Sequence, residues 1–195
     1  MRYAIGHKTR TRTRILETAA RLFRRKGYTA TGVDAVMAAA GLTAGGFYAH
    51  FRSKQAMLAE ALDLAFQQSI DRARSRLASS HGADWIRGFI TFYLSKEHRD
   101  APERGCPMPA LASEVARLNP ACRAVFEKRL QERLAAIEAH AGAPARSAIP
   151  GVALSVGALV LARAVSNRDL SDRILEECRA ALLRDISRAE ARASS

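Results

Sequence analysis

The sequence predicts an all-α protein of about nine helices, divided into a small basic head and a larger, nearly neutral body. Three observations support this fold class. Alternating runs of β-branched residues, which would indicate strands, are absent. Ala, Leu, Arg and Glu recur at helical spacing along the chain. Gly, Ser, Thr and Pro stand between these periodic segments, where they start or stop helices.

The first predicted helix is Thr13–Lys26, which has one apolar face and carries arginines elsewhere. Gly27 is expected to end it, because glycine adopts the left-handed backbone that closes a helix at low cost. Thr31 then offers an N-cap for a second helix. Asp34, three residues later, completes a capping-box pattern with it.

Two short helices are expected next, at about residues 33–40 and 44–50. Gly41 separates them, and Thr43 is positioned to cap the second one. Ser53 is the expected cap of a long helix that continues to about residue 79. The head is therefore predicted to contain three helices, two of them short.

Beyond residue 80 the pattern remains helical, and all six prolines lie after residue 101. Ala101–Pro109 is predicted to be a break. Helices are expected near Ala83–His98, Ala110–Arg117, Pro120–His140, Ser147–Ser166 and Ser171–Ala189, with loops at Gly142–Pro144 and Asn167–Leu170. The most hydrophobic stretch, Ile149–Val165, is too short for a membrane span, and the N-terminus lacks the apolar core of a secretion signal, so we expect a cytoplasmic protein.

The positive charge is concentrated in the head. Residues 1–54 carry a net charge of +9, whereas the remaining 141 residues carry +3 of the total of +12. Such a distribution is typical of a module that binds a polyanion. A basic, solvated surface without a partner is the alternative.

Two short helices joined by a tight turn containing glycine indicate a helix-turn-helix. Gly41 supplies the left-handed turn residue, and Leu42 is expected to face inward. The second helix exposes small or polar residues and includes Gly45 and Gly46, each of which costs about 1 kcal/mol relative to Ala within a helix. These glycines make sense if the helix must lie close to a nucleic-acid groove and its phosphates.

The run ILETAARLFRRKGYTATGVDAVMAAAGLTAGGFYAHFRSKQAML resembles the DNA-binding domain of the TetR family of repressors, over roughly residues 12–58. The aromatic-rich FYAHF, followed by SK and a long apolar helix, is typical of that family. The resemblance implies that Ala44 to His50 enter the major groove. The residues expected at DNA bases or phosphates are Thr31, Thr43, Ala44, Gly45, Gly46, Tyr48, His50 and Lys54.

Three of these residues also have ordinary structural explanations. Tyr48 would alternatively be a partly buried core aromatic, His50 a solvent-facing helix end, and Lys54 a surface charge. Further towards the N-terminus, basic side chains could reach a neighbouring groove or phosphate, an electrostatic contribution that salt should weaken. They are Lys8, Arg10 and Arg12.

The resemblance further implies that the body forms a homodimer through its last two helices and encloses a small-molecule pocket. Both helices carry apolar stripes that could pair as a four-helix bundle, or could instead complete the core of one subunit. The candidate interface residues are Val152, Val156, Leu159, Val160, Ile174, Cys178 and Leu182. The candidate pocket residues, which could equally be core, are Trp85, Phe89, Phe92, Tyr93, Met108, Leu111, Val115, Phe126 and Leu130.

Cys106 is a candidate redox or electrophile sensor. It lies beside Arg104 and just before a predicted helix, where a thiolate is stabilised. The block GCPMPALASE, which contains this cysteine, is similar to one in TetR relatives, some of which respond to electrophiles or oxidants through it. In many others it is structural, and a buried, inert cysteine is the alternative here. The three cysteines are odd in number and widely spaced, so we expect neither a disulfide framework nor a zinc site. We also expect no metal site of another kind and no cofactor.

The sequence therefore predicts a homodimeric one-component transcriptional regulator, expected to be a repressor, although activation stays open. It is expected to bind a palindromic operator and to be released by a small molecule or electrophile. Its DNA-binding domain is assigned to residues 1–54, and its ligand-binding and dimerisation domain to residues 55–195. A sequence-nonspecific architectural DNA-binding protein is one alternative. A thiol-dependent enzyme is another, but the five histidines are scattered and Cys106 has no evident base.

Overall fold

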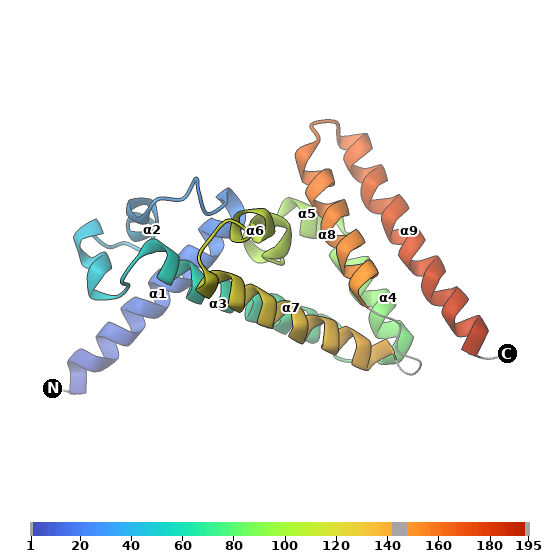
Figure 1. The fold of residues 1–195 in the computed structure, drawn as a ribbon, viewed down its shortest axis with the longest axis horizontal. Helices are drawn as coiled ribbons and strands as arrows, with labels where there is room; N and C mark the ends of the chain where they lie inside the picture. Colours follow the sequence, from blue (N-terminus) through green and yellow to red (C-terminus); the bar gives the residue numbers. More distant parts are fainter. Residues whose placement is uncertain (1, 142–147, 194–195) are drawn as a thin grey trace. The chain divides into compact units, whose positions relative to one another are not determined.

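A computed structural model describes residues 2–141 and 148–193, and within these ranges it contains helices and no strand. This confirms the predicted all-α fold class (Figure 1). The described elements are α1 (Arg2–Lys26), α2 (Val33–Ala39), the 3₁₀ segment η1 (Ala44–Ala49), α3 (Lys54–Arg76), α4 (Gly82–Tyr93), α5 (Lys96–Asp100), the 3₁₀ segment η2 (Pro102–Arg104), α6 (Met108–Val115), α7 (Pro120–Ala141), α8 (Ile149–Ala164) and α9 (Arg168–Ala193).

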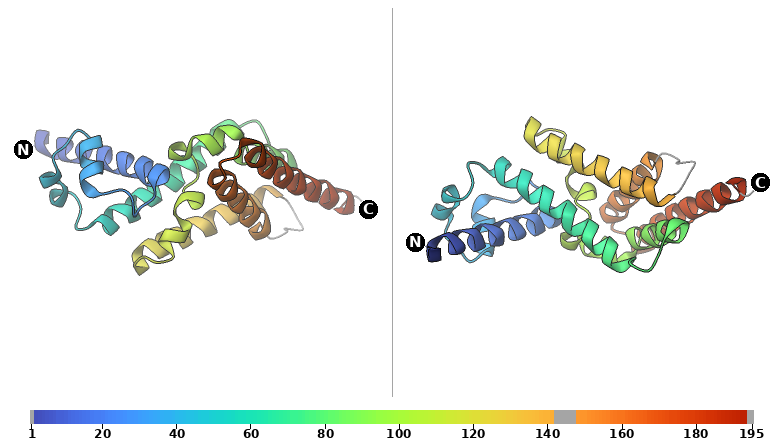
Figure 2. Two further views of the ribbon diagram at one scale, coloured as in Figure 1. Left: turned by 90° about the horizontal axis from the view of Figure 1, so that it is seen from above. Right: turned by 90° about the horizontal axis from the view of Figure 1, so that it is seen from below.

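The chain folds as two compact units. The first unit comprises the residues up to Ser69 together with Pro102–Arg129, and the second comprises Ile70–Ala101 together with the residues from Leu130 onward. Both views in Figure 2 show α8 and α9 of the second unit side by side. None of the helices within the described ranges is long and apolar enough to cross a membrane.

The core of the first unit is built from apolar faces of α1, η1 and α3. Each of these segments contributes large side chains that are almost completely buried, as the helical spacing of the sequence predicts. They are Ile15, Phe23, Phe47, Met57, Leu58, Leu62 and Phe66. Two polar contacts also tie α1 to α3: Arg12 donates to Glu60, and Arg24 donates to Gln68 at 2.8 Å.

The predicted glycine turns are present. Gly27 has φ +83° and Gly41 has φ +67°, both in the left-handed region. The hydroxyl of Ser53 accepts a hydrogen bond from the N–H of Ala56 at 3.0 Å, so Ser53 caps the start of α3 as expected.

The predicted capping box at the start of the second helix is wrong. Gly32 is the N-cap of α2, and no side chain caps it. The Thr31 hydroxyl instead donates a hydrogen bond back to the carbonyl of Gly27 at 2.7 Å, which closes the turn after α1. Thr43 likewise makes no side-chain cap at η1. The hydroxyl of Thr31 is therefore used by the preceding turn rather than by the following helix.

Several helix boundaries also differ from the prediction. The first helix begins at Arg2 rather than Thr13. The predicted helix 83–98 is two helices, α4 and α5, because the chain turns at Leu94 and Ser95, whose side chain caps α5 by accepting from the N–H of His98 at 3.1 Å. The segment 44–50 is a 3₁₀ segment rather than an α-helix. The predicted loop at Gly142–Pro144 lies outside the described residues.

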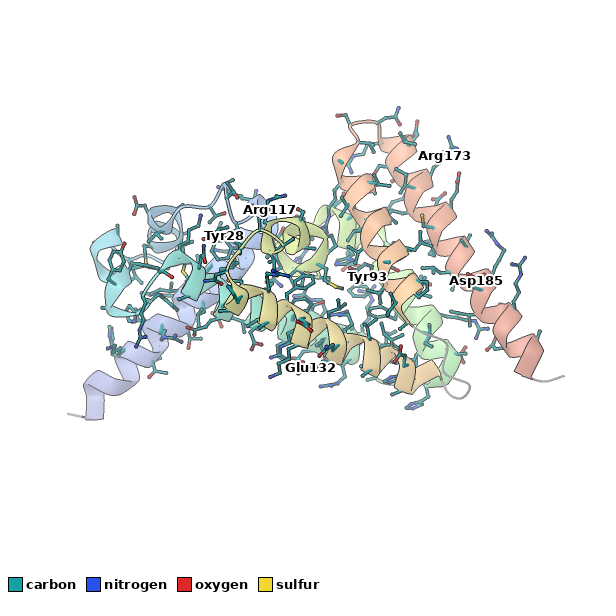
Figure 3. All side chains as sticks on the ribbon, viewed as in Figure 1. Tyr28, Tyr93, Arg117, Glu132, Arg173 and Asp185 are labelled. Atoms are coloured by element: carbon teal, nitrogen blue, oxygen red, sulfur yellow. The ribbon has the colours of Figure 1, made fainter. Side chains whose placement is uncertain are left out.

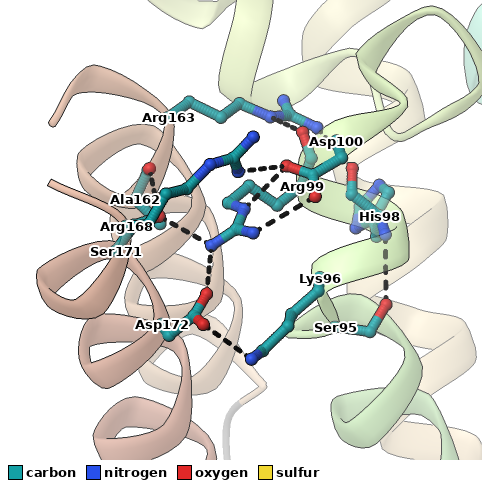
Figure 4. A network of polar contacts seen from close by, with 10 residues as sticks. All are labelled: Ser95, Lys96, His98, Arg99, Asp100, Ala162, Arg163, Arg168, Ser171 and Asp172. Atoms are coloured by element: carbon teal, nitrogen blue, oxygen red, sulfur yellow. Dashed lines mark hydrogen bonds and ion pairs between the residues drawn. The ribbon is translucent and has the colours of Figure 1, made fainter. Parts of the chain in front are cut away.

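A polar network joins α5 to α8 and α9 inside the second unit (Figure 4). Arg99, only 5% exposed, donates to the Ser171 hydroxyl at 2.8 Å and to Asp172 at 2.6 Å. Arg163 of α8 donates to the carbonyls of His98 and Arg99 at 2.7 and 3.0 Å. These carbonyls lie near the C-terminal end of α5, where helix carbonyls need outside donors, so the network fixes this short helix.

Candidate nucleic-acid interface

The segment α2–turn–η1 forms a compact helix-turn-helix. Val36 and Met37 of α2 and Phe47 of η1 are buried, so the two short elements pack through their apolar faces. In the turn, the N–H of Leu42 donates to the carbonyl of Met37 at 2.9 Å. Leu42 itself is half-buried, in line with its expected inward orientation. The turn and the packing therefore hold η1 against α2.

The outer surface of η1 is formed by exposed small residues and one aromatic side chain. Thr43, Ala44 and Gly45 are exposed, and Gly46 is half-buried. Tyr48 is 78% exposed, and its ring meets Phe47 edge-on at 5.2 Å between centroids. This exposure excludes a core role for Tyr48.

The two glycines of η1 are not required by packing. A Cβ atom at Gly45 would meet nothing within 4 Å, and one at Gly46 would lie 3.6 Å from Cε of Met37, an ordinary contact distance. Neither glycine appears among the residues with positive φ. The fold would therefore accommodate alanine at both positions. Because the glycines have no side chains, another molecule could come close to the backbone of η1 at these positions.

His50 closes η1 and is half-buried. Its Nδ1 is buried and has no hydrogen-bond partner among the described residues. Burial lowers the pKa of His50, and the nearby charges of Lys8 and Arg12 lower it further. These effects favour the neutral imidazole, and the half-buried ring lies beside the exposed η1 surface rather than at a fully solvated helix end.

Lys54, the first residue of α3, lies over an aromatic ring. Its Nζ is 4.1 Å from the centroid of the Tyr28 ring. Tyr28 follows the end of α1 and is labelled in Figure 3. Burial lowers the pKa of Lys54, while the charge of Glu114 acts to raise it. The ring restricts this ammonium group to a defined position beside the helix-turn-helix, unlike an ordinary surface lysine.

The remaining predicted contact residues differ in accessibility. Lys8 and Arg10 are exposed on α1. Arg12 pairs with Glu60 at 2.5 Å and stacks over the ring of Phe51 at 4.8 Å, so its charge is neutralised within the protein. Thr31 is 1% exposed, and its side chain lies below the surface. The sequence did not indicate the roles of Glu60 or Glu114, since their partners are distant in the chain.

Comparison with known proteins identifies the relatives of this helix-turn-helix. Residues 15–61 match the family described as "Bacterial regulatory proteins, tetR family". The Escherichia coli NemR reduced form is 25% identical, with a TM-score of 0.71 over 88% of this chain and 94% of NemR. A TetR transcriptional regulator from Chloroflexus aurantiacus J-10-FL is 26% identical, with a TM-score of 0.74 over 93% of this chain and 96% of that chain. The chain belongs to the TetR family of transcriptional regulators.

Curated relatives match over a shorter span. The uncharacterized HTH-type transcriptional regulator YxaF of Bacillus subtilis (strain 168) is 32% identical over 125 residues, which is 60% of this chain and 62% of YxaF. YerO of the same strain, also an uncharacterized HTH-type transcriptional regulator, is 36% identical over 62 residues, which is 32% of this chain and 22% of YerO. The chain thus spans less than two thirds of either relative.

Four of the aromatic residues predicted to line a pocket lie on α4, within the second unit. Trp85 and Phe89 of α4 stack at 5.3 Å, and Phe89 and Tyr93 lie 5.7 Å apart at a tilt. Trp85 also stacks on His140 of α7 at 4.1 Å. Phe92 is half-buried, as is Leu130. Tyr93, which is labelled in Figure 3, is the last residue of α4 and is buried.

The other predicted pocket residues belong to the first unit. Met108, Leu111 and Val115 are buried along α6. Phe126 of α7 meets Phe66 of α3 edge-on at 5.6 Å. Within each unit these side chains pack on neighbouring aromatic or apolar groups, and a ligand pocket stays a prediction.

The predicted interface residues of α8 and α9 divide by burial. Leu159 and Leu182 are 0% and 8% exposed and belong to the core of the second unit. Val160 is 41% exposed, while Val152, Val156, Ile174 and Cys178 are half-buried. The apolar side chains that α8 exposes most are Ile149, Leu154, Val160 and Leu161.

Cys106, the candidate sensor, lies just before α6 and is 1% exposed. Arg104, which was expected to stabilise the thiolate of Cys106, is exposed. Its Nε lies 3.8 Å from Oε1 of Glu103. Among the described residues, no group of three His, Cys, Asp or Glu side chains is arranged to hold a metal ion.

Proposed function

We propose that this TetR-family chain is a homodimeric one-component repressor that binds a palindromic DNA operator through η1. The proposal rests above all on the surface of η1, where Tyr48 is 78% exposed beside two glycines that the fold does not require. Glycines without side chains next to an exposed tyrosine would let η1 come close to a DNA groove. The net charge of +9 on residues 1–54 would attract the phosphates.

In this proposal the residues of the head divide into two roles. Thr43, Gly45 and Tyr48 meet base edges or adjacent phosphates, and His50, in its neutral form, can donate or accept a hydrogen bond there. Lys54 contacts a phosphate from its position over Tyr28. Lys8 and Arg10 are exposed on α1 and add sequence-independent attraction.

The test is a titration of the full-length chain with a palindromic duplex from its own promoter region and with random duplex of equal length. Tyr48→Ala should weaken binding to the palindrome by at least about tenfold, because an exposed side chain contributes to DNA contact rather than to the core. Lys54→Ala should also weaken it, and should reduce the slope of log affinity against log salt by about 1.

Lys128→Ala is the matched control, because Lys128 is exposed on α7 and its loss changes the net charge equally. Unchanged binding by both head variants would contradict the docking geometry. Equal affinity of the wild-type chain for the palindrome and for random duplex would instead favour a sequence-nonspecific architectural protein.

We further propose that a small molecule bound by the body releases the operator, by favouring a conformation that holds DNA less well. An electrophile acting at Cys106 is a second class of inducer. A neighbour of known structure, NemR, is described in a reduced form. Operator release by an electrophile that is abolished in Cys106→Ser would support this class, and release that is unaffected would remove it.

A further inference from the structure

A carboxylate in the first unit holds the turn that follows α1. Glu114 of α6 accepts a hydrogen bond from the backbone N–H of Tyr28 at 2.7 Å through Oε2, and from that of Thr29 at 2.8 Å through Oε1. An ionised carboxylate can receive both N–H groups at once, whereas an amide has only one acceptor oxygen. Burial acts to raise the pKa of Glu114, but these hydrogen bonds and the charge of Lys54 outweigh it and lower the pKa overall.

The turn held by Glu114 also carries the ring that supports Lys54. Tyr28 donates its N–H to Glu114 and places its ring 4.1 Å below the Lys54 ammonium. Glu114 also acts on Lys54 through its charge. One carboxylate therefore orders both the backbone and the charged group at the start of α3.

This carboxylate is not the only tie between α1 and the segment that contains α6. Arg24 of α1, 4% exposed, donates to the carbonyl of Gly105 at 3.2 Å, just before α6. The buried side chains Met108, Leu111 and Val115 hold α6 along its length. The helix would thus keep its place without Glu114, which leaves the order of the 27–29 turn as the main consequence of the carboxylate.

We propose that Glu114 is a positioning residue for DNA binding, which fixes the 27–29 turn and, through the ring of Tyr28, places Lys54 for contact with a phosphate. This inference rests on the proposed function. It also predicts that the loss of this negative charge weakens DNA binding, which is opposite to the general electrostatic effect. Removing a negative charge should strengthen the attraction to DNA in general, whereas removing a positioning carboxylate should weaken binding.

The experiment compares Glu114→Gln with Glu127→Gln in the full-length chain. Glu127 is exposed on α7, so both variants lose one negative charge. The probe is a fluorescein-labelled duplex that the wild-type chain selects from a random-sequence library, with a scrambled duplex of the same composition beside it. Glu114→Gln should raise the Kd for the selected duplex about tenfold, equivalent to about 1.4 kcal/mol. Glu127→Gln should leave it unchanged or lower it slightly.

A double-mutant cycle shows whether Glu114 acts through Lys54. In a Lys54→Met background, Glu114→Gln should raise the Kd by no more than about twofold, because the ammonium group that Glu114 positions is already absent. A full tenfold loss in that background, or binding by Glu114→Gln as tight as by Glu127→Gln, would overturn the inference.

Glu114→Asp provides a second variant should the glutamine protein not fold. It keeps the charge but shortens the side chain by one methylene, so it should weaken binding in the same direction, and wild-type affinity would overturn the inference. A wild-type chain that binds the selected and scrambled duplexes equally would instead contradict the proposed function itself, so the two failures are distinguishable.

Discussion

The buried imidazole of His98 shows how a single residue shapes the response of this protein to pH. Burial lowers the pKa of His98 from 6.5 to about 4, and the charges of Arg163, Arg133 and Arg72 act in the same direction, against the hydrogen bond to the Tyr93 carbonyl. That carbonyl can only accept, so Nδ1, 2.7 Å away, carries the proton of the neutral ring.

The consequence is a loss of stability in mild acid. Between about pH 6.5 and pH 4 the unfolded chain binds a proton at His98 that the folded chain does not, so the free energy of unfolding falls as the pH falls through this window. The expected loss is on the order of 3 kcal/mol, and it is absent above pH 6.5. Urea denaturation at a series of pH values should show this slope.

The variant His98→Asn, which keeps a donor for the Tyr93 carbonyl, should lose most of the slope. His81→Asn, at an exposed position, should retain it. An identical slope in the His98 variant would assign the acid sensitivity to other groups.

The candidate DNA contacts show what single residues reveal in a sequence. Tyr48 and Lys54 could be predicted because they stand in a recognisable local motif. The structure shows Tyr48 exposed on η1 and the Lys54 ammonium over the ring of Tyr28, and their contact with DNA stays a prediction. The side chain of Thr31 is buried and bonds to Gly27, and Arg12 is paired with Glu60, 48 residues away. Local pattern cannot show such partners, because they are brought together only by the fold. Glu114 was noticed only as part of a cysteine-containing block for the same reason.

At the level of elements, two turns of the head can be compared directly. Gly27 and Gly41 both have positive φ, which L side chains rarely adopt. A Cβ atom at Gly41 would meet nothing within 4 Å, whereas at Gly27 it would lie 3.0 Å from Oε2 of Glu114. Gly41→Ala should therefore destabilise the chain by about 1–2 kcal/mol from backbone strain alone.

Gly27→Ala should cost more than Gly41→Ala, because it adds a steric clash that displaces the Glu114 carboxylate from the N–H groups of Tyr28 and Thr29. Thermal or urea unfolding of both variants measures the difference. Equal losses would mean that the carboxylate moves aside freely, and that its two hydrogen bonds add little to stability.

The helical periodicity of the sequence predicted where most helices lie. The residues at which they begin and end depend on local backbone conformation and on side-chain hydrogen bonds. The stop at Gly27 was predictable, because only a left-handed residue closes a helix in this way. The break between α4 and α5 was not predicted, since Leu94 and Ser95 are no strong helix breakers and the apolar spacing continues across them. The network around Arg99 stabilises α5 after this break through contacts that come from α9, more than 70 residues later.

For the whole molecule, the exposed apolar side chains of α8 are the strongest sign of an oligomer. Ile149, Leu154, Val160 and Leu161 are 38–59% exposed. Exposed apolar side chains gathered on one element favour association. A two-fold dimer would also present two copies of η1 to a palindrome, and thereby multiply the affinity of a head that makes few contacts alone.

Leu161→Glu should convert the proposed dimer to a monomer. In a two-fold interface one substitution acts twice, so it removes two buried leucines, each worth about 1.5–3 kcal/mol, and brings two like charges into the same contact. Sedimentation equilibrium measures the change in mass. The variant should also lose its preference for a full palindrome over a single half-site, while its head keeps the weak binding of one copy. Ala135→Glu, at an exposed position on α7, adds the same charge and should stay dimeric. A Leu161→Glu protein that remains dimeric would place the subunit contact elsewhere.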